Sequence, residues 1–206
     1  MSNKYDEIYA TPNIDFRGGK PQQAVKKITE LIKSGEVLDI GGGEGRNALF
    51  LADAGFQVTL IDLSRVGVEK FKKEAKKRNL VVRSHIADIV EIGVIQSYDV
   101  IVVSYVFQHI TDFAARKVIE QMKEKTRAGG FNVVSVLTAE GDFYNENPST
   151  KNFYPKPNEL KEIYNDWEII AYDKMDSRAL RNRTDGTPMV NNAEVLIARK
   201  NCGRNF

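Results

Sequence analysis

The chain has little of the side-chain chemistry that disulfides and metal centres require. Its single cysteine, Cys202, excludes an internal disulfide and lies in the C-terminal tail, a poor place for a nucleophile. The two histidines, His85 and His109, have no partner at metal-ligand spacing, so we expect no metal site. This composition is typical of a protein from a reducing compartment.

Strong charge and long hydrophobic runs are also missing. The formal net charge of +2 is too small to favour nucleic acid or a membrane surface as a partner. No apolar run approaches the roughly 20 residues that span a bilayer. The N-terminus lacks the apolar core of a signal peptide. We therefore expect a cytoplasmic monomer or homodimer that binds neither nucleic acid nor membrane.

The composition suits one globular domain. With 206 residues, 42% of them hydrophobic, the chain can bury a substantial core, and we expect a single domain over 1–206. The predicted strands are 36–40, 58–63, 80–89, 98–104 and 131–137, and the predicted helices are 21–34, 46–54, 65–78 and 113–126. Ser64 and Asp112 are expected to cap two helices, and Gly129-Gly130 to end the last one. This alternation predicts an α/β fold, a parallel sheet with helices on both faces.

The last third of the chain breaks this rhythm. An irregular stretch, 141–157, precedes a helix near 158–164 and two β-like runs, 167–172 and 194–198. The runs have no helix between them, and Asp185-Gly186 is a turn signal, so an antiparallel pair is predicted at one side of the sheet. We expect 141–192 to form a substrate cap. Residues 1–19 are either a cap segment over a pocket or a partly ordered terminus.

One glycine-rich turn stands out as a ligand site. The apolar strand Val37-Leu38-Asp39-Ile40 runs into Gly41, Gly43 and Gly45, and a helical pattern follows. Glycines at such a turn allow positive φ and a close approach of ligand to backbone. The start of the helix presents unpaired N–H groups and a positive dipole end. The turn therefore predicts a site for a polar or anionic ligand.

The ends of the other strands extend this site. In open α/β sheets ligands bind beyond the carboxyl ends of the strands, which brings together Asp39, Asp62, Asp88 and residues 104–109. Asp62 lies about 20 residues beyond Gly41, the usual place for a carboxylate that accepts ribose hydroxyls. It could instead be a helix-entry residue.

The glycine turn could bind either of two classes of nucleotide ligand. A nicotinamide site requires a third small residue in G-x-G-x-x-G/A, and Arg46 is too large for that position. The spacing is G-x-G-x-G, preceded by Asp39, which could bind a ligand ammonium or hold the loop. The pattern favours an amino-acid nucleoside without pyrophosphate, that is, S-adenosylmethionine.

The stretch VLDIGGGEGRNALFLADAGFQVTLIDLS resembles the signature of class I S-adenosylmethionine-dependent methyltransferases. The resemblance implies a Rossmann-like, mostly parallel seven-stranded sheet whose C-terminal strand is antiparallel. It further implies cofactor contacts from Asp39, Gly41, Gly43 and Arg46 to the methionine part, Asp62 to the ribose, Leu63, Asp88 and Ile89 to the adenine, and Ser104 and Tyr105 beside the transferred methyl group.

A narrower resemblance covers the C-terminal part. The segments RAGGFNVVSVLTAEGDFY, FYPKPNELKEIYNDWEIIAYDK and NRTDG are similar to tellurite-resistance methyltransferases of the TehB type. That family implies a small-molecule acceptor, such as a chalcogen oxyanion or a thiol. Its late segment has a His before Arg-Thr-Asp. Here Arg183, Thr184 and Asp185 match, but Asn182 replaces the histidine and its titratable group.

The catalytic candidates are Arg183 and His109. Arg183, with Arg178 and Arg181, either holds an anionic acceptor or belongs to a solvated basic loop. His109 is a base, a pocket wall or a structural residue, since a soft acceptor needs no general base. Two alternatives to an S-adenosylmethionine-dependent enzyme stay open: a non-catalytic binder of that cofactor and an NAD-dependent oxidoreductase. A DNA amine methyltransferase is disfavoured because no Asn/Asp-Pro-Pro-aromatic motif follows the fourth strand.

Overall fold

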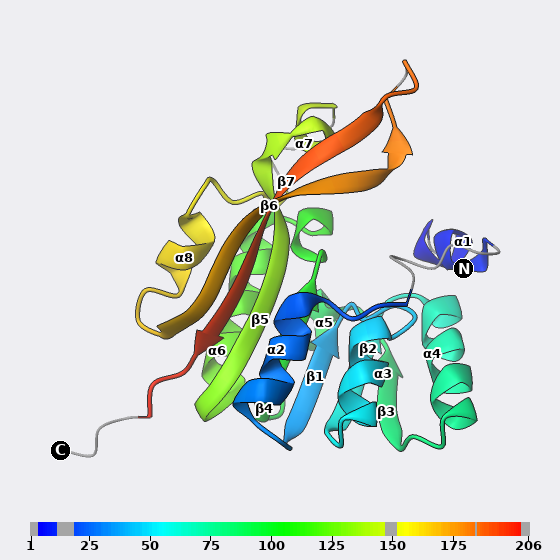
Figure 1. Ribbon diagram of the computed structural model, residues 1–206, viewed down its shortest axis with the longest axis vertical. Coiled ribbons are helices and arrows are strands. Elements are labelled where there is room, and N and C mark those ends of the chain that lie inside the picture. Colours follow the sequence, from blue (N-terminus) through cyan, green and yellow to red (C-terminus); the bar gives the residue numbers. More distant parts are fainter. Residues whose placement is uncertain (1–3, 12–18, 147–151, 184, 203–206) are drawn as a thin grey trace.

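The computed structural model describes residues 4–11, 19–146, 152–183 and 185–202, which are built around a seven-stranded sheet (Figure 1). The strands are β1 Glu36–Ile40, β2 Gln57–Asp62, β3 Val82–Ile86, β4 Tyr98–Ser104, β5 Thr126–Gly141, β6 Glu168–Asn182 and β7 Pro188–Arg199. The helices are α1 Lys4–Ala10, α2 Gln23–Leu31, α3 Arg46–Asp53, α4 Arg65–Lys77, α5 Ile89–Ile92, α6 Asp112–Lys125, α7 Asp142–Glu146 and α8 Glu159–Ile163, with a 3-10 turn, η1, at Phe107–His109.

The strand order is β3-β2-β1-β4-β5-β7-β6. The first five strands pair in parallel, and β7 runs antiparallel to both β5 and β6. This arrangement confirms the predicted parallel sheet with an antiparallel pair at one side.

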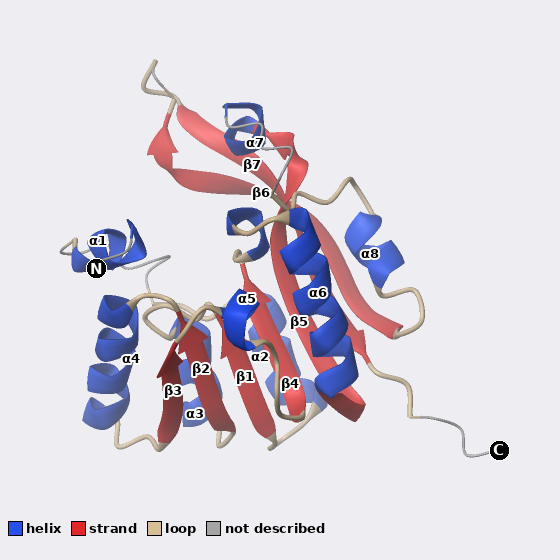
Figure 2. Ribbon diagram, turned by 180° about the vertical axis from the view of Figure 1, so that it is seen from behind, coloured by secondary structure: helices blue, strands red, loops and turns tan. Residues whose placement is uncertain are grey.

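Helices cover both faces of the sheet and enclose two core layers. Helices α2, α3 and α4 pack on one face, and α5, α6 and α8 lie on the face seen in Figure 2. Along β4, Val100 and Val102 point into the first layer, whereas Ile101 and Val103 point into the second. A strand buried on both faces needs apolar residues at every position, which explains the continuous apolar run. In the described part of the chain, no helix has the length and apolarity to cross a membrane.

The junction between α6 and β5 differs from the prediction. The helix is capped by Thr111, whose hydroxyl accepts a hydrogen bond from the Ala114 N–H at 3.3 Å, and not by Asp112. It ends at Lys125, and β5 begins at the next residue, so Gly129-Gly130 lie inside the strand. A Cβ on Gly130 would lie 2.6 Å from the Asp99 carbonyl oxygen, so this glycine permits close strand pairing rather than ending a helix. The third strand also starts later than predicted, at Val82 rather than residue 80.

The last two strands are much longer than the β-like runs that predict them. Strand β6 has 15 residues and β7 has 12, and together they form a ribbon that extends past the ends of β1–β4 (Figure 1). The ribbon turns at the predicted Asp185-Gly186, where the Arg183 N–H donates to the Thr187 carbonyl at 2.8 Å. Its outer half carries many polar residues, so no apolar alternation marks it as strand.

Candidate functional site

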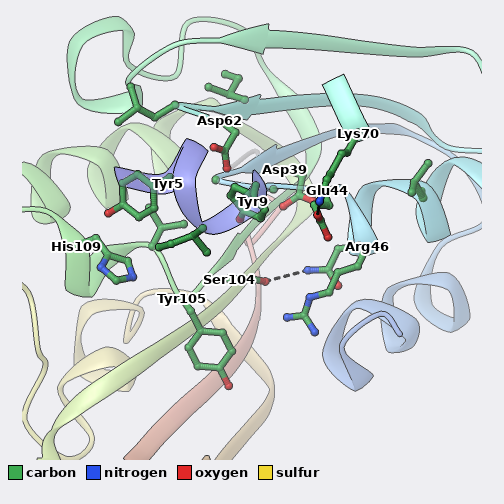
Figure 3. Close-up of a pocket in the computed structure, with 18 of the residues that line it drawn as sticks. Tyr5, Tyr9, Asp39, Glu44, Arg46, Asp62, Lys70, Ser104, Tyr105 and His109 are labelled. Carbon is green, nitrogen blue, oxygen red and sulfur yellow. Dashed lines mark hydrogen bonds and ion pairs between the residues drawn. The ribbon is translucent and has the colours of Figure 1, made fainter. Parts of the chain in front are cut away.

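A cavity of about 1250 Å³ opens at the carboxyl ends of the parallel strands. Its walls come from the glycine turn, from residues after β2, β3 and β4, and from α1 (Figure 3). The predicted site residues among them are Asp39, Gly41, Arg46, Asp62, Leu63, Asp88, Ile89, Ser104, Tyr105 and His109. The structure thus brings four strand ends into one neighbourhood, as the sequence predicts. Gly43 lies in the turn itself, and Arg183 is not a wall residue of this cavity.

The glycine turn has no space for a side chain at Gly41 or at Gly43. Gly41 has φ of +64°, and a Cβ there would collide with the Val106 side chain. Gly43 has φ of +56°, and a Cβ there would collide with the Tyr9 hydroxyl. The Gly41 N–H donates to the Ile61 carbonyl at 2.7 Å, which ties the turn to β2. The absence of side chains at these two glycines therefore lets Val106 and Tyr9 pack directly against the backbone of the turn.

Asp39 is a buried carboxyl group at the base of the turn. Its side chain is 1% exposed, and neither oxygen accepts a hydrogen bond of ordinary geometry from any described residue. Burial raises the pKa of the Asp39 carboxyl to about 7, and Asp62 adds to the rise, whereas Arg46 and the Ala48 N–H act against it. Buried polar groups normally have partners, so Asp39 has the properties of a residue that binds a ligand cation.

Asp62 combines a structural role with its place in the cavity wall. One carboxylate oxygen accepts a hydrogen bond from the Gly43 N–H at 2.8 Å, and the other accepts one from the Ser64 N–H at 2.7 Å. Burial is the main cause that raises the pKa of Asp62, and these two N–H donors oppose it. Because each carboxylate oxygen can accept a second hydrogen bond, Asp62 can hold the glycine turn and still accept ligand hydroxyls.

The end of the cavity beyond β2 and β3 is mostly apolar. Leu63 is 41% exposed toward it, whereas Ile89 is 6% exposed and belongs to the core beneath α5 and α6. Asp88 caps α5, because its carboxylate accepts a hydrogen bond from the Val90 N–H at 2.8 Å. An apolar slot with one carboxylate at its edge suits a flat heterocycle that carries an amino group.

Ser104 is held in a polar network that sequence reasoning missed. Its hydroxyl donates to the Gln22 side-chain oxygen at 2.8 Å and accepts a hydrogen bond from the Asn47 amide at 3.0 Å. The Ser135 hydroxyl donates to the same Gln22 oxygen at 3.1 Å. Ser104 therefore joins β4 to α3 and to the start of α2. No local pattern identifies Gln22, which is 82 residues away from Ser104 in the chain.

Beyond Ser104 the cavity reaches the last third of the chain. Tyr105 has φ of +58°, which is strained for a bulky residue, and its ring points away from Asp39 in Figure 3. Leu137, Phe143 and Asn191 line this end, and the Phe143 N–H donates to the Asn191 side-chain oxygen at 2.8 Å. Parts of the predicted cap region 141–192 thus meet the cavity. Asn191 belongs to that region, although the sequence analysis did not single it out.

His109 is a wall residue close to α1. Tyr5 contacts its ring edge-on, with 5.7 Å between the ring centroids, and the Gln108 amide nitrogen lies 3.4 Å from His109 Nε2. The side chain of His109 is exposed to the cavity. Burial among the surrounding protein atoms is the main cause that lowers the pKa of His109 well below its usual value, and the positive charge of Lys4 lowers it further. The ring is therefore uncharged at neutral pH, which suits a pocket wall better than a strong base.

Arg183 lies at the turn of the ribbon, directly after the end of β6. Its guanidinium forms an ion pair with Asp142 on α7 at 2.5 Å and donates to the Thr187 hydroxyl at 3.3 Å. Asp142 precedes the wall residue Phe143, so Arg183 lies one residue removed from the cavity lining. Thr184 and the side chains of residues 177–182, which include Arg178, Arg181 and Asn182, lie outside the described part of the chain.

Comparison with known proteins places the chain in a family. The family model described as "Tellurite resistance protein TehB" matches residues 13–189. The chain belongs to the TehB family. A curated relative from Haemophilus influenzae, the "Probable S-adenosyl-L-methionine-dependent methyltransferase TehB", is 30% identical over 176 residues. The match covers 85% of this chain and 61% of the relative, so the chain spans about three fifths of that protein's length.

Solved structures agree with this assignment. The crystal structure of TehB from Haemophilus influenzae aligns with a TM-score of 0.78 and 27% identity, over 95% of this chain and 65% of that chain. The N-methyltransferase NodS from Bradyrhizobium japonicum, solved with S-adenosyl-L-homocysteine, aligns with a TM-score of 0.70 over 95% of this chain and 96% of that chain. At 15% identity, NodS supports the fold alone. The expected Rossmann-like class I methyltransferase fold is confirmed.

Proposed function

We propose that this TehB-family chain is an S-adenosylmethionine-dependent methyltransferase that acts on a small-molecule acceptor. The observation that carries this proposal is Asp39, a buried carboxyl group at the base of the glycine turn that accepts no hydrogen bond of ordinary geometry from the described residues. The ammonium group of S-adenosylmethionine is a cation that would complete it. When bound, this cofactor supplies an electrophilic methyl group on a sulfonium.

The other wall residues fit the rest of the cofactor. Arg46 at the start of α3 offers a positive charge for the methionine carboxylate. The carboxylate oxygens of Asp62 retain acceptor capacity for the two ribose hydroxyls. Leu63, Ile89 and Asp88 form an apolar slot with an acceptor at its edge, which suits adenine.

For the acceptor, we propose a chalcogen oxyanion, such as tellurite or selenite, or a soft nucleophile such as a thiol. Family membership supports this class. The lowered pKa of His109, which makes its imidazole a weak base, also supports it, because a soft lone pair needs no general base. Arg183 would hold the anionic acceptor, in competition with Asp142, its present ion-pair partner. Ser104 and Tyr105 would position the acceptor for in-line approach to the methyl group.

Calorimetry tests the cofactor assignment. S-Adenosylmethionine and S-adenosylhomocysteine are expected to bind the wild type, and NAD is not. Asp39→Asn should raise the dissociation constants of both ligands by at least about tenfold, because it removes the charge that pairs with their ammonium group. Asp173→Asn, an exposed position on β6, serves as the matched control and should change nothing. Tight NAD binding without a response to the other two ligands would contradict the proposal.

A methyl-transfer screen tests the acceptor. Production of S-adenosylhomocysteine is measured with tellurite, selenite, thiols and small amines, and turnover with any of them separates an enzyme from a non-catalytic binder. Arg183→Ala should reduce turnover of an oxyanion without changing cofactor affinity. The control is Arg199→Ala, since Arg199 forms a similar exposed ion pair with Glu168 at the far end of β7. Equal turnover in the two variants would remove Arg183 from the acceptor site.

A further inference from the structure

Helix α1 forms one wall of the cofactor cavity. Four of its residues, Lys4, Tyr5, Ile8 and Tyr9, line the same space as Asp39 and Asp62. Tyr5 and Tyr9 are one helical turn apart, so both rings point to the same side, and Figure 3 shows α1 crossing the cavity with both tyrosines. The helix packs against α4, at the side of the cavity where the glycine turn lies.

Tyr9 has the closest contact with the glycine turn. Its hydroxyl lies against Gly43, at the position that a Cβ would occupy, and its ring lies 3.3 Å from the Cβ position of Gly67 on α4. The charges of Asp62, Glu44 and Asp39 all act on its phenol. Tyr9 therefore stands between the two carboxylates to which the ammonium and ribose of the cofactor are assigned.

Asp6 fixes α1 to the first turn of α4. Its carboxylate accepts a hydrogen bond from the Ser64 hydroxyl at 2.7 Å and another from the Val66 N–H at 3.1 Å. Ser64 is the N-cap of α4, and its own N–H donates to Asp62. A carboxylate at a helix N-terminus also interacts favourably with the helix dipole. Asp6, Ser64 and Asp62 thus form a continuous link from α1 to the glycine turn.

We propose that Tyr9 is a cofactor-binding residue that closes the methionine and ribose part of the site, and that Asp6 is the positioning residue that holds it there. This inference rests on the proposed function. Burial raises the pKa of Tyr9, and Asp62 adds to the rise, so the phenol stays protonated and remains a hydrogen-bond donor. Its ring supplies an apolar cover for a ligand that spans Asp39 and Asp62.

The test measures the affinity and release of S-adenosylhomocysteine. Tyr9→Leu should raise the dissociation constant and the dissociation rate about tenfold, because both ring and hydroxyl are lost. Tyr9→Phe keeps the ring and should fall between Tyr9→Leu and the wild type. Asp6→Ala should raise the dissociation rate about threefold or more, because it removes the oxygen that accepts both hydrogen bonds from α4. Glu7→Ala, which removes the neighbouring exposed carboxylate on α1, is the matched control and should stay within about twofold of the wild type.

A double-mutant cycle tests the contact itself. Gly43→Ala should push Tyr9 away and weaken S-adenosylhomocysteine binding, in addition to any cost of the positive φ. In the Tyr9→Leu background the collision is absent, so Gly43→Ala should cost less there than in the wild type. Additive effects would show that Tyr9 does not press on the turn when the ligand is bound, and would overturn the contact.

Hydrogen exchange gives a readout that a purely structural role would not move. The amides of 4–10 should exchange more slowly when S-adenosylhomocysteine is bound, and Asp6→Ala should remove most of that protection. Unchanged affinity in Tyr9→Leu, together with equal exchange of α1 with and without ligand, would overturn the inference while the proposed function stands. Absence of any binding by the wild type would overturn the proposed function first and the inference with it.

Discussion

Asp39 has a carboxyl group in the middle of a sheet whose facing residues are apolar. Its partners across the two neighbouring strands are Leu60 and Val102. A charge in this position costs stability, and that cost shows in the raised pKa of about 7. The residue therefore makes sense as a ligand contact rather than as part of the fold.

The raised pKa predicts that cofactor binding releases a proton. A ligand ammonium favours the ionised carboxylate, so the pKa of Asp39 should fall on binding. At pH 6 the free protein holds this proton, and binding should release about one proton; above pH 7 the release should fade. Affinity for S-adenosylhomocysteine should accordingly rise with pH up to about 7.5, beyond which the ligand's own amino group begins to deprotonate.

Calorimetry in buffers of different ionisation enthalpy measures this proton release. Asp39→Asn should abolish it, and Asp173→Asn should leave it intact. If Asp39→Asn still bound ligand and released the same proton, the titrating group would have to be another one.

At the scale of elements, the direct passage from α6 into β5 leaves the last carbonyl groups of the helix in need of a donor. Lys200, just after β7, provides one: its ammonium donates to the carbonyl oxygens of Lys123, Glu124 and Thr126 at 2.7, 3.0 and 2.8 Å. A cation at a helix C-terminus also interacts favourably with the dipole. Lys200 thus connects the end of α6 to the end of β7.

Lys200→Met should lower the free energy of unfolding by about 1–2 kcal/mol, the scale of charge-assisted hydrogen bonds to a helix end. Urea unfolding measures the change, and affinity for S-adenosylhomocysteine should stay the same. Lys117→Met, an exposed position in the middle of α6, removes the same charge without this contact and should have little effect. A loss of equal size in both variants would contradict the capping role.

At the scale of the whole molecule, two buried carboxyl groups in the cavity wall reduce the free energy of unfolding at neutral pH. Burial raises the pKa values of both Asp39 and Asp62 above those of unfolded chains. A carboxyl whose pKa is raised by folding contributes no penalty when it is protonated in both states. The penalty appears as pH rises through the unfolded pKa of about 4 and is complete above the folded pKa.

Asp39→Asn should therefore be more stable than the wild type at pH 8, by on the order of 2–4 kcal/mol, with a difference that shrinks toward zero near pH 4. Urea unfolding of both proteins between pH 4 and 8.5 measures this difference. The result would be a variant that gains stability as it loses the cofactor. A constant difference across that range would show that Asp39 does not titrate as described.

The cavity wall at the strand ends was predictable because its residues lie at or just after the ends of successive parallel strands. A parallel sheet is enough to bring these residues together at the carboxyl ends of its strands, and periodicity along the chain predicts that sheet. The residues are Asp39, Asp62, Asp88 and Ser104. Each of these positions is a local property of strand, turn and helix start. The sequence by itself therefore determined the fold class and most of the residues that line the cavity at the strand ends.

Tertiary packing alone decided the remaining features. Arg183 pairs with Asp142, 41 residues away, so its guanidinium already has a partner. The Ser104 hydroxyl is held by Gln22 across 82 residues. These contacts depend on which side chains meet across helices and strands after folding. No repeating pattern along the chain encodes such meetings.

The contact of Tyr9 with the glycine turn is also decided by tertiary packing. The i, i+4 spacing of Tyr5 and Tyr9 indicates one face of a helix, but not what that face covers. Docking of α1 depends on the Asp6 contacts with Ser64 and Val66, which bridge about 60 residues of chain. Local periodicity predicts elements because hydrogen bonds within an element repeat at short range, whereas the partners of a side chain are set by long-range packing.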